Sequence, residues 1–211
     1  MKRAFSIFLT TVLLAGMFPL PAHPAAATVA GWPDETQRIV YLDEDFEDAS
    51  LFPAGSPPEY ADWSDAASAG TGPVVWVNTA TGGGTVSVVE EDGGTNRSVQ
   101  ITKTAASGSD KSESVLDFSN RALSGRVFIE MKVMSVGAMM GTQCLPYIGN
   151  AEGSTIVAIQ FNNNHIRAYN GGSASNIQPF QPGQWVHLAV AIDTETDTYD
   201  LYIDGQRKLP G

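Results

Sequence analysis

The sequence predicts an all-β fold, and two observations support that prediction. Helical periodicity is almost absent beyond residue 27, while short runs rich in Val, Ile, Phe and Thr recur between clusters of Gly, Ser, Asn and Pro. This spacing is typical of a β-sandwich or a β-barrel. The expected strands are 74–78, 85–89, 98–102, 114–118, 127–136, 145–148, 155–161, 165–169, 185–193 and 198–203.

The N-terminus has the pattern of a secretory signal peptide. Lys2 and Arg3 precede an apolar run over 4–18, and prolines and the small residues 25–27 follow. The alternative is an uncleaved membrane anchor, but the run is shorter than the roughly 20 apolar residues that a bilayer span needs. The expected segments of this secreted (extracellular or periplasmic) protein are a signal peptide over 1–27, a loose lead over 28–40 and one domain over 41–211.

Residues 49–72 are predicted to form a long surface loop, because several prolines and small residues fill the segment. A loop of this size is often functional. Three aromatic residues in or near the loop are secondary candidates, each suited either to stacking on a ligand or to filling the core: Tyr60, Trp63 and Trp76.

The stretch over 181–206 predicts a β-hairpin whose two arms can be assigned face by face. In the first arm, large apolar residues occupy every second position, which is typical of a strand with one face buried in the core. The proposed core face is Val186, Leu188, Val190 and Ile192, opposite Trp185, His187, Ala189 and Ala191. The second arm places Tyr199, Leu201 and Ile203 on one side and Asp200, Tyr202 and Asp204 on the other. Residues 194–198 connect the arms, and Asp204-Gly205 predicts a further tight turn.

This hairpin resembles the C-terminal half of a concanavalin A-like (laminin-G-like) jelly-roll domain. The resemblance rests on Trp185, an alternating strand that ends in Asp193, a Thr-rich turn and the Tyr-x-x-Tyr-x-Asp-Gly pattern over 199–205. It extends from residue 42 to the end and is best over 155–206. It implies an antiparallel two-sheet β-sandwich of the jelly-roll type. Lectins, carbohydrate-binding modules, glycoside hydrolases and polysaccharide lyases share this superfamily, so a polysaccharide or other glycan is the implied partner.

The C-terminus is short for such a domain. Only residues 206–211 follow the Asp204-Gly205 turn, about the length of one minimal strand. Because members of the family continue with further strands, we expect the domain to be incomplete at this end. The alternative is that a short terminal strand over 206–209 is sufficient to complete this end of the domain.

Composition argues against some partners. The net charge of −11 becomes more negative when Lys2 and Arg3 are removed with the signal peptide. Such a surface repels phosphates, so we expect no nucleic-acid partner and no electrostatic docking to anionic lipid. No other segment approaches the length of a bilayer span, so we expect no membrane insertion after signal cleavage. A strongly polyanionic glycan would need a local basic patch, whereas Lys and Arg are scattered in the sequence. Cys144 is the sole cysteine, which excludes an intrachain disulfide and suits a small buried apolar residue.

The acidic run over 43–48 offers several oxygen ligands of the kind that calcium takes. It is not an EF-hand, because position six is Asp48 instead of Gly and position twelve is Ala54 instead of Glu. Related jelly-roll modules often place a structural calcium ion between an N-terminal acidic residue and a C-terminal Asp. The resemblance therefore implies Ca²⁺ as a cofactor, with Asp45 and Glu47 as its ligands; the alternative is a solvated acidic strand edge.

Two catalytic signatures of this fold are incomplete here. Glu195-x-Asp197-x-x-Asp200 is similar to the Glu-x-Asp-x-x-Glu signature of jelly-roll glucanases, but it ends in Asp and begins in a hairpin connection, where turn chemistry explains it better. The segments nearest to the motifs of alginate-lyase-like members are 126–132, 160–162 and 167–169. Segment 160–162 lacks the His of the corresponding motif, and segment 167–169 lacks the Tyr-x-Lys context. We therefore assign no catalytic residue.

The strands place polar and aromatic side chains opposite the predicted core. If Val127, Ile129, Met131 and Val133 face the core, residues 130 and 132 face away, and the same alternation exposes residues of the later strands. Sugar recognition uses fixed polar groups beside aromatic rings. The alternative is that the polar face of an antiparallel sheet is simply solvated. The candidate ligand-binding residues are Glu130, Lys132, Gln160, His165, Arg167, Tyr169, Trp185 and His187.

The leading hypothesis is a secreted, non-catalytic carbohydrate-binding or adhesion module, alone or as part of a larger polysaccharide-processing protein. The second is a polysaccharide lyase or glycoside hydrolase of the same fold, with His165, Gln160, Arg167 or Tyr169 near the chemistry. The third is a structural surface domain without a ligand.

Overall fold

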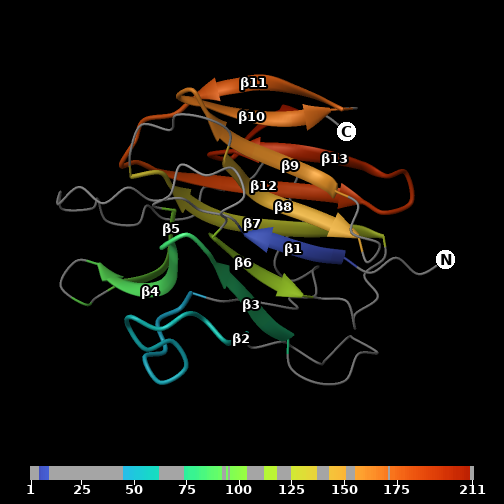
Figure 1. Ribbon diagram of the computed structural model, residues 1–211. Helices are drawn as coiled ribbons and strands as arrows, with labels where there is room; N and C mark the ends of the chain where they lie inside the picture. Colours follow the sequence, from blue (N-terminus) through green and yellow to red (C-terminus); the bar gives the residue numbers. More distant parts are fainter. Residues whose placement is uncertain are drawn as a thin grey trace.

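The computed structural model describes residues 5–9, 45–61, 74–91, 94, 96–103, 112–117, 125–136, 143–150, 155–170 and 172–209 (Figure 1). Within these residues every regular element is a β-strand, and the strands that pair do so in antiparallel fashion. The expected all-β class is therefore confirmed. The part of the chain described here contains no helix that is long and apolar enough to cross a membrane.

Three sheets are formed by the described strands. The strands are β1 (Phe5–Leu9), β2 (Tyr60–Ala61), β3 (Val74–Ala80), β4 (Thr85–Glu91), β5 (Asn96–Thr102), β6 (Ser112–Asp117), β7 (Arg126–Met134), β8 (Gln143–Asn150), β9 (Thr155–Asn162), β10 (His165–Asn170), β11 (Ser173–Pro179), β12 (Trp185–Asp193), β13 (Thr198–Ile203) and β14 (Gln206–Leu209). The largest sheet has the order β11-β10-β9-β8-β1-β6-β3-β2, the second β14-β13-β12-β7, and the third is the β4-β5 hairpin.

Each strand expected from the sequence has a counterpart here. The bounds differ by about two residues at most, and the terminal strand over 206–209 is present as β14. The sequence did not predict β1, β2 or β11. The backbone of β1 pairs with β6 and with β8 and lies inside the predicted signal peptide, whose cleavage stays a prediction.

The main core lies between the large sheet and the four-stranded sheet, in the upper part of Figure 1. Because side chains alternate along a strand, every second residue of β7, β9, β10, β12 and β13 reaches this layer. Its buried members are Val133, Val157, Ile159, Phe161, Ile166, Ala168, Phe180, Val186, Leu188, Val190, Ile192, Leu201 and Ile203. The predicted core faces of β7 and β12 are thus confirmed, and the arrangement is sandwich-like.

Tight turns set the register of the C-terminal strands. Asp204 and Gly205 both have positive φ, 50° and 77°, as the predicted type I′ turn requires. In the turn between β12 and β13, Asp193 Oδ1 accepts hydrogen bonds from the N–H groups of Glu195 (2.9 Å) and Thr196 (3.1 Å). These bonds lower the pKa of Asp193, with Glu195 contributing most. The interpretation of Glu195 and Asp197 as turn residues is confirmed.

The segment over 45–61 hydrogen-bonds with Val88 of β4 through Gly55 and Ser56, and it contributes two rings to an aromatic cluster. Phe46 makes an edge-to-face contact with Phe52, with ring centroids 5.2 Å apart, and lies 5.9 Å from the Trp76 ring. Trp76 thus belongs to an aromatic cluster, in line with the core-filling alternative for this residue. Trp63 and the side chain of Tyr60 lie outside the described residues.

Candidate functional site

The eight predicted ligand-binding residues lie in two groups on different sheets. Four belong to β7 and β12 of the four-stranded sheet: Glu130, Lys132, Trp185 and His187. The other four belong to β9 and β10 of the large sheet: Gln160, His165, Arg167 and Tyr169. Their strand neighbours form the core between the sheets, so the two groups point to opposite outer faces. The eight candidate residues therefore do not share one surface.

The first group is brought together by the register of β7 and β12. His187 pairs with Lys132, Ala189 pairs with Glu130, and Trp185 pairs with Met134. His187 Nε2 lies 3.4 Å from Glu130 Oε2. A histidine, two charged side chains and an indole therefore share the outer face of the four-stranded sheet, which we call the β7–β12 face; it includes the outward residues of β13.

The centre of the β7–β12 face is more buried than the sequence predicts. His187 is only 5% exposed, and Ala189 and Ala191 pack with Tyr202 and Phe128 in a small second apolar cluster. The alternation was predicted correctly, but the alanine methyls leave room for the neighbouring rings to close over the strand. The expected solvent exposure of His187 is therefore wrong.

The edge of the β7–β12 face carries an ion-pair cluster that sequence reasoning missed. Asp200 Oδ1 accepts a hydrogen bond from Arg207 Nη2 at 2.6 Å, and Asp200 Oδ2 lies 3.3 Å from Arg126 Nη2. The hydrogen bond to Asp200 raises the pKa of Arg207 above its ordinary value. The Arg126 guanidinium also lies 5.7 Å from the centroid of the Phe128 ring. The available signal was Asp200 itself, an acidic residue within a predicted strand.

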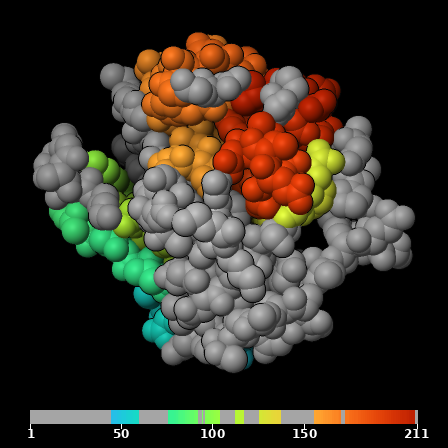
Figure 2. All heavy atoms as spheres, turned by 90° about the vertical axis from the view of Figure 1, so that its right-hand side faces the viewer, coloured from blue at the N-terminus to red at the C-terminus, as the bar shows by residue number. Residues whose placement is uncertain are grey.

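Figure 2 shows one end of this region, where the turn between β12 and β13, in red, lies beside the start of β7, in yellow-green. The Thr194 N–H donates to the Gly125 carbonyl at 3.0 Å. This bond and the pairing of Asp193 with Arg126 hold the first residue of β7 against the end of β12. The position of Arg126 is therefore set by backbone pairing.

The second group forms a hydrogen-bonded cluster on the outer face of β9 and β10. Gln160 Nε2 donates to Tyr169 Oη at 3.3 Å, and Arg167, the register partner of Gln160, donates to the Ala174 carbonyl at 3.1 Å. Gln160 is only 4% exposed, so its predicted exposure is wrong. His165 sits at the start of β10, where its Nδ1 lies 3.0 Å from the Asn163 carbonyl.

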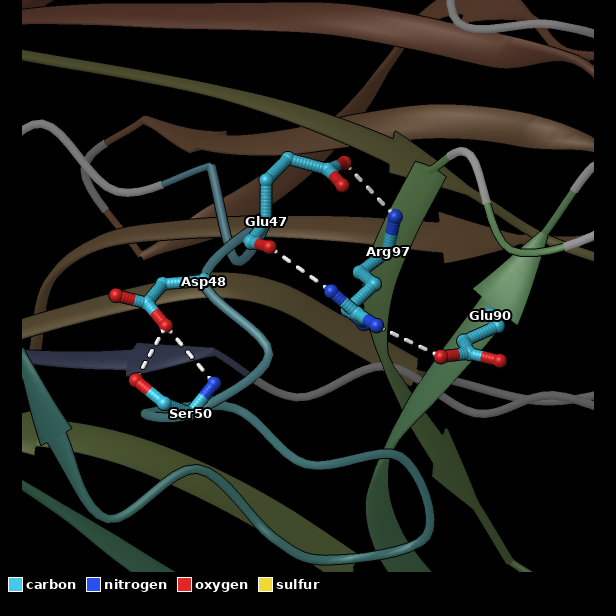
Figure 3. Close-up of polar contacts among 5 residues, drawn as sticks. All are labelled: Glu47, Asp48, Ser50, Glu90 and Arg97. Carbon is cyan, nitrogen blue, oxygen red and sulfur yellow. Dashed lines mark hydrogen bonds and ion pairs between the residues drawn. The ribbon is translucent and has the colours of Figure 1, made fainter.

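Protein groups partly engage the two predicted calcium ligands, of which Figure 3 draws Glu47. Asp45 Oδ1 accepts the N–H of Glu47 at 3.0 Å, and Glu47 Oε1 accepts the N–H of Arg97 at 2.8 Å. Arg97 Nη1 donates to the Glu47 carbonyl at 2.8 Å, while Nη2 pairs with Glu90 at 2.7 Å. Glu47 therefore joins the N-terminal segment to the β4-β5 hairpin.

Asp48, in the same acidic run, caps a turn of its own. Its Oδ1 accepts hydrogen bonds from Ser50 Oγ at 2.6 Å and from the Ser50 N–H at 2.8 Å, which lowers the pKa of Asp48 (Figure 3). Among the residues that the structure describes, no group of three or more His, Cys, Asp or Glu side chains is arranged to hold a metal ion. The calcium site stays a prediction.

No family model, curated protein or solved structure matches this chain. The resemblance to the concanavalin A-like superfamily therefore stays an expectation from the sequence.

Proposed function

We propose that this protein is a secreted, non-catalytic carbohydrate-binding or adhesion module built on a concanavalin A-like jelly-roll sandwich. Support for the fold comes from the two antiparallel sheets that share one apolar core. Support for export comes from the charged and apolar regions at the N-terminus. The partner is a polysaccharide or other glycan.

The observation that supports binding most directly is the composition of the β7–β12 face. Trp185 and Lys132 are partly exposed, and Glu130, one-third exposed, lies against the buried His187. Sugars are recognised by polar groups held in fixed positions for their hydroxyls and by apolar rings for their C–H faces. The Glu130–His187 contact restricts one such polar group before a ligand arrives, which reduces the entropy lost on binding.

A polysaccharide lyase or glycoside hydrolase of the same fold is the second candidate. The hydrogen bond between Gln160 and Tyr169, with Arg167 beside Gln160, favours it because it gathers a phenol, an amide and a guanidinium on one face. His165 and Tyr169 are four positions apart along β10, roughly 13 Å of extended chain. Any reaction there would use His165 and Tyr169 on different parts of the substrate. The enzyme hypothesis predicts that His165→Ala abolishes turnover and leaves glycan binding measurable.

A combined screen tests the proposed function. The exported chain is applied to a glycan array and to polysaccharide-containing native gels, with and without calcium, and released unsaturated or reducing sugar is measured in parallel. Retention without product is the expected result. Product release would move the assignment to the lyase or hydrolase, and the absence of both from a folded chain would favour a structural surface domain. Loss of retention on calcium removal would support the predicted Asp45 and Glu47 site.

A further inference from the structure

We propose that Arg126 and Arg207 form a subsite that binds the carboxylate of an acidic sugar, a uronate, at the edge of the β7–β12 face. This inference rests on the proposed glycan-binding function and names the chemical class of its ligand. The sequence alone gives no reason to place these two arginines together, since they lie on β7 and β14. The structure brings them to the same carboxylate.

The arginines are fixed by a buried acid and are themselves accessible. The Asp200 side chain is 9% exposed and bridges the two guanidinium groups, whereas the Arg126 and Arg207 side chains are 54% and 52% exposed. Each guanidinium presents five N–H donors in a planar fork, more than the contacts to Asp200 use. Asp200 balances one of the two positive charges, and Asp193, the register partner of Arg126, offsets part of the second. A single bound carboxylate would balance the remainder.

The surroundings favour a sugar acid over a free anion. Glu130, Ala189, Tyr202 and Arg207 are successive register partners in one row across the four strands. At about 4.8 Å between strands, this row separates Glu130 from Arg207 by roughly 14 Å. Phe128, partly exposed and in contact with Arg126, adds apolar surface next to the cations, whereas Tyr202, opposite Arg207, is buried. Because Ala189 and Tyr202 are buried in the middle of this row, a glycan would meet the arginines at the edge of the face and would not lie along the row.

Two opposing electrostatic effects decide how strong such a subsite is. The net charge of −11 repels any anion, and Asp193, the register partner of Arg126, lies near the subsite. Distant charges are screened over about 8 Å at physiological salt, and Asp193 Oδ1 accepts two N–H groups of its own turn. Asp193 keeps its charge and lowers the affinity of the subsite for an anion, while the two guanidinium groups remain the donors that a bound carboxylate would meet. Charge-assisted hydrogen bonds of this kind change affinity by about ten- to a hundredfold.

The test compares a polyuronate with the same polymer after chemical reduction of its carboxyl groups. Affinities of the exported chain and its variants are measured by affinity electrophoresis at physiological salt. The key variant is Arg126→Gln/Asp200→Asn/Arg207→Gln, which removes both cations without leaving a buried carboxylate unpaired. Lys103→Gln, which removes one positive charge at the end of β5, is the matched control. Circular dichroism confirms that each variant is folded.

The wild-type chain and Lys103→Gln are expected to bind the polyuronate at least about tenfold more tightly than the reduced polymer, and the triple variant to lose this preference. Equal binding of both polymers by the wild type, or an unchanged preference in the triple variant, would overturn the subsite and leave the proposed function intact. Absence of binding to every polysaccharide by the folded chain would overturn both. Tighter binding to dextran sulfate than to the polyuronate would show unselective anion attraction and also overturn the carboxylate subsite.

Discussion

Replacing Phe161 by alanine is expected to lower the free energy of unfolding by about 3–5 kcal/mol. Phe161 is completely buried in the core between the large sheet and the four-stranded sheet, so its removal leaves a cavity that the rigid strands fill poorly. Its ring also meets the Phe180 ring edge to face, with centroids 4.5 Å apart and an interplanar angle of 73°. Such pairs contribute about 0.5–1.5 kcal/mol beyond the buried area.

Urea unfolding followed by tryptophan fluorescence measures this loss. With a slope of about 2 kcal/mol per molar urea, the midpoint of Phe161→Ala falls by about 1.5–2.5 M. Val77→Ala, at a position that is 49% exposed, serves as the control and changes stability by less than about 0.5 kcal/mol. A double-mutant cycle of Phe161→Leu with Phe180→Leu isolates the ring contact. A loss below about 1 kcal/mol for Phe161→Ala would refute the packing of the two sheets on one core.

Two further predictions concern a close backbone approach and a buried phenol. A methyl group at Gly84 would lie 2.0 Å from Ser112 Oγ and 2.6 Å from the Thr102 carbonyl oxygen, so Gly84→Ala is expected to destabilise the fold by about 1–3 kcal/mol in urea melts. Adding Ser112→Ala should recover only part of the loss, because the carbonyl clash remains; full recovery would contradict the geometry. Burial raises the pKa of Tyr199 to about 12, and its hydroxyl donates to the Tyr169 carbonyl. Because the folded pKa exceeds the unfolded value of about 10, this stabilisation is complete below pH 10 and disappears towards pH 12. Wild-type stability should therefore fall more steeply than that of Tyr199→Phe over this range, and parallel pH profiles would show the reasoning to be wrong.

Much of the fold was predictable because its strands have a strict two-residue alternation. The pattern of β12 and the Asp204-Gly205 turn are local signals, and both were interpreted correctly. β11, with the sequence SASNIQP, was missed because it is polar and has low intrinsic strand preference. It exists as an edge strand because it pairs with β10. Such pairing between strands leaves no signal in the composition of the strand itself.

The candidate site was less predictable, because burial and neighbours depend on which strands meet. Alternation correctly placed Gln160 and His187 away from the core, but it says nothing about what packs over the outer face. Arg126 and Asp200 are 74 residues apart in sequence and meet only through the pairing of β7, β12 and β13. The sequence therefore assigned the direction of each side chain but not which polar residues share a surface.

The most direct test of the proposed glycan-binding face is affinity electrophoresis of two point variants on a polysaccharide that retains the wild-type chain. Trp185→Ala removes the indole of the β7–β12 face, whereas Tyr169→Phe removes the hydroxyl that binds Gln160 on the opposite face. The proposal predicts that Trp185→Ala loses most of its retention and Tyr169→Phe keeps it. Retention that survives Trp185→Ala and is lost in Tyr169→Phe would place the ligand on the outer face of β9 and β10 and contradict the proposal.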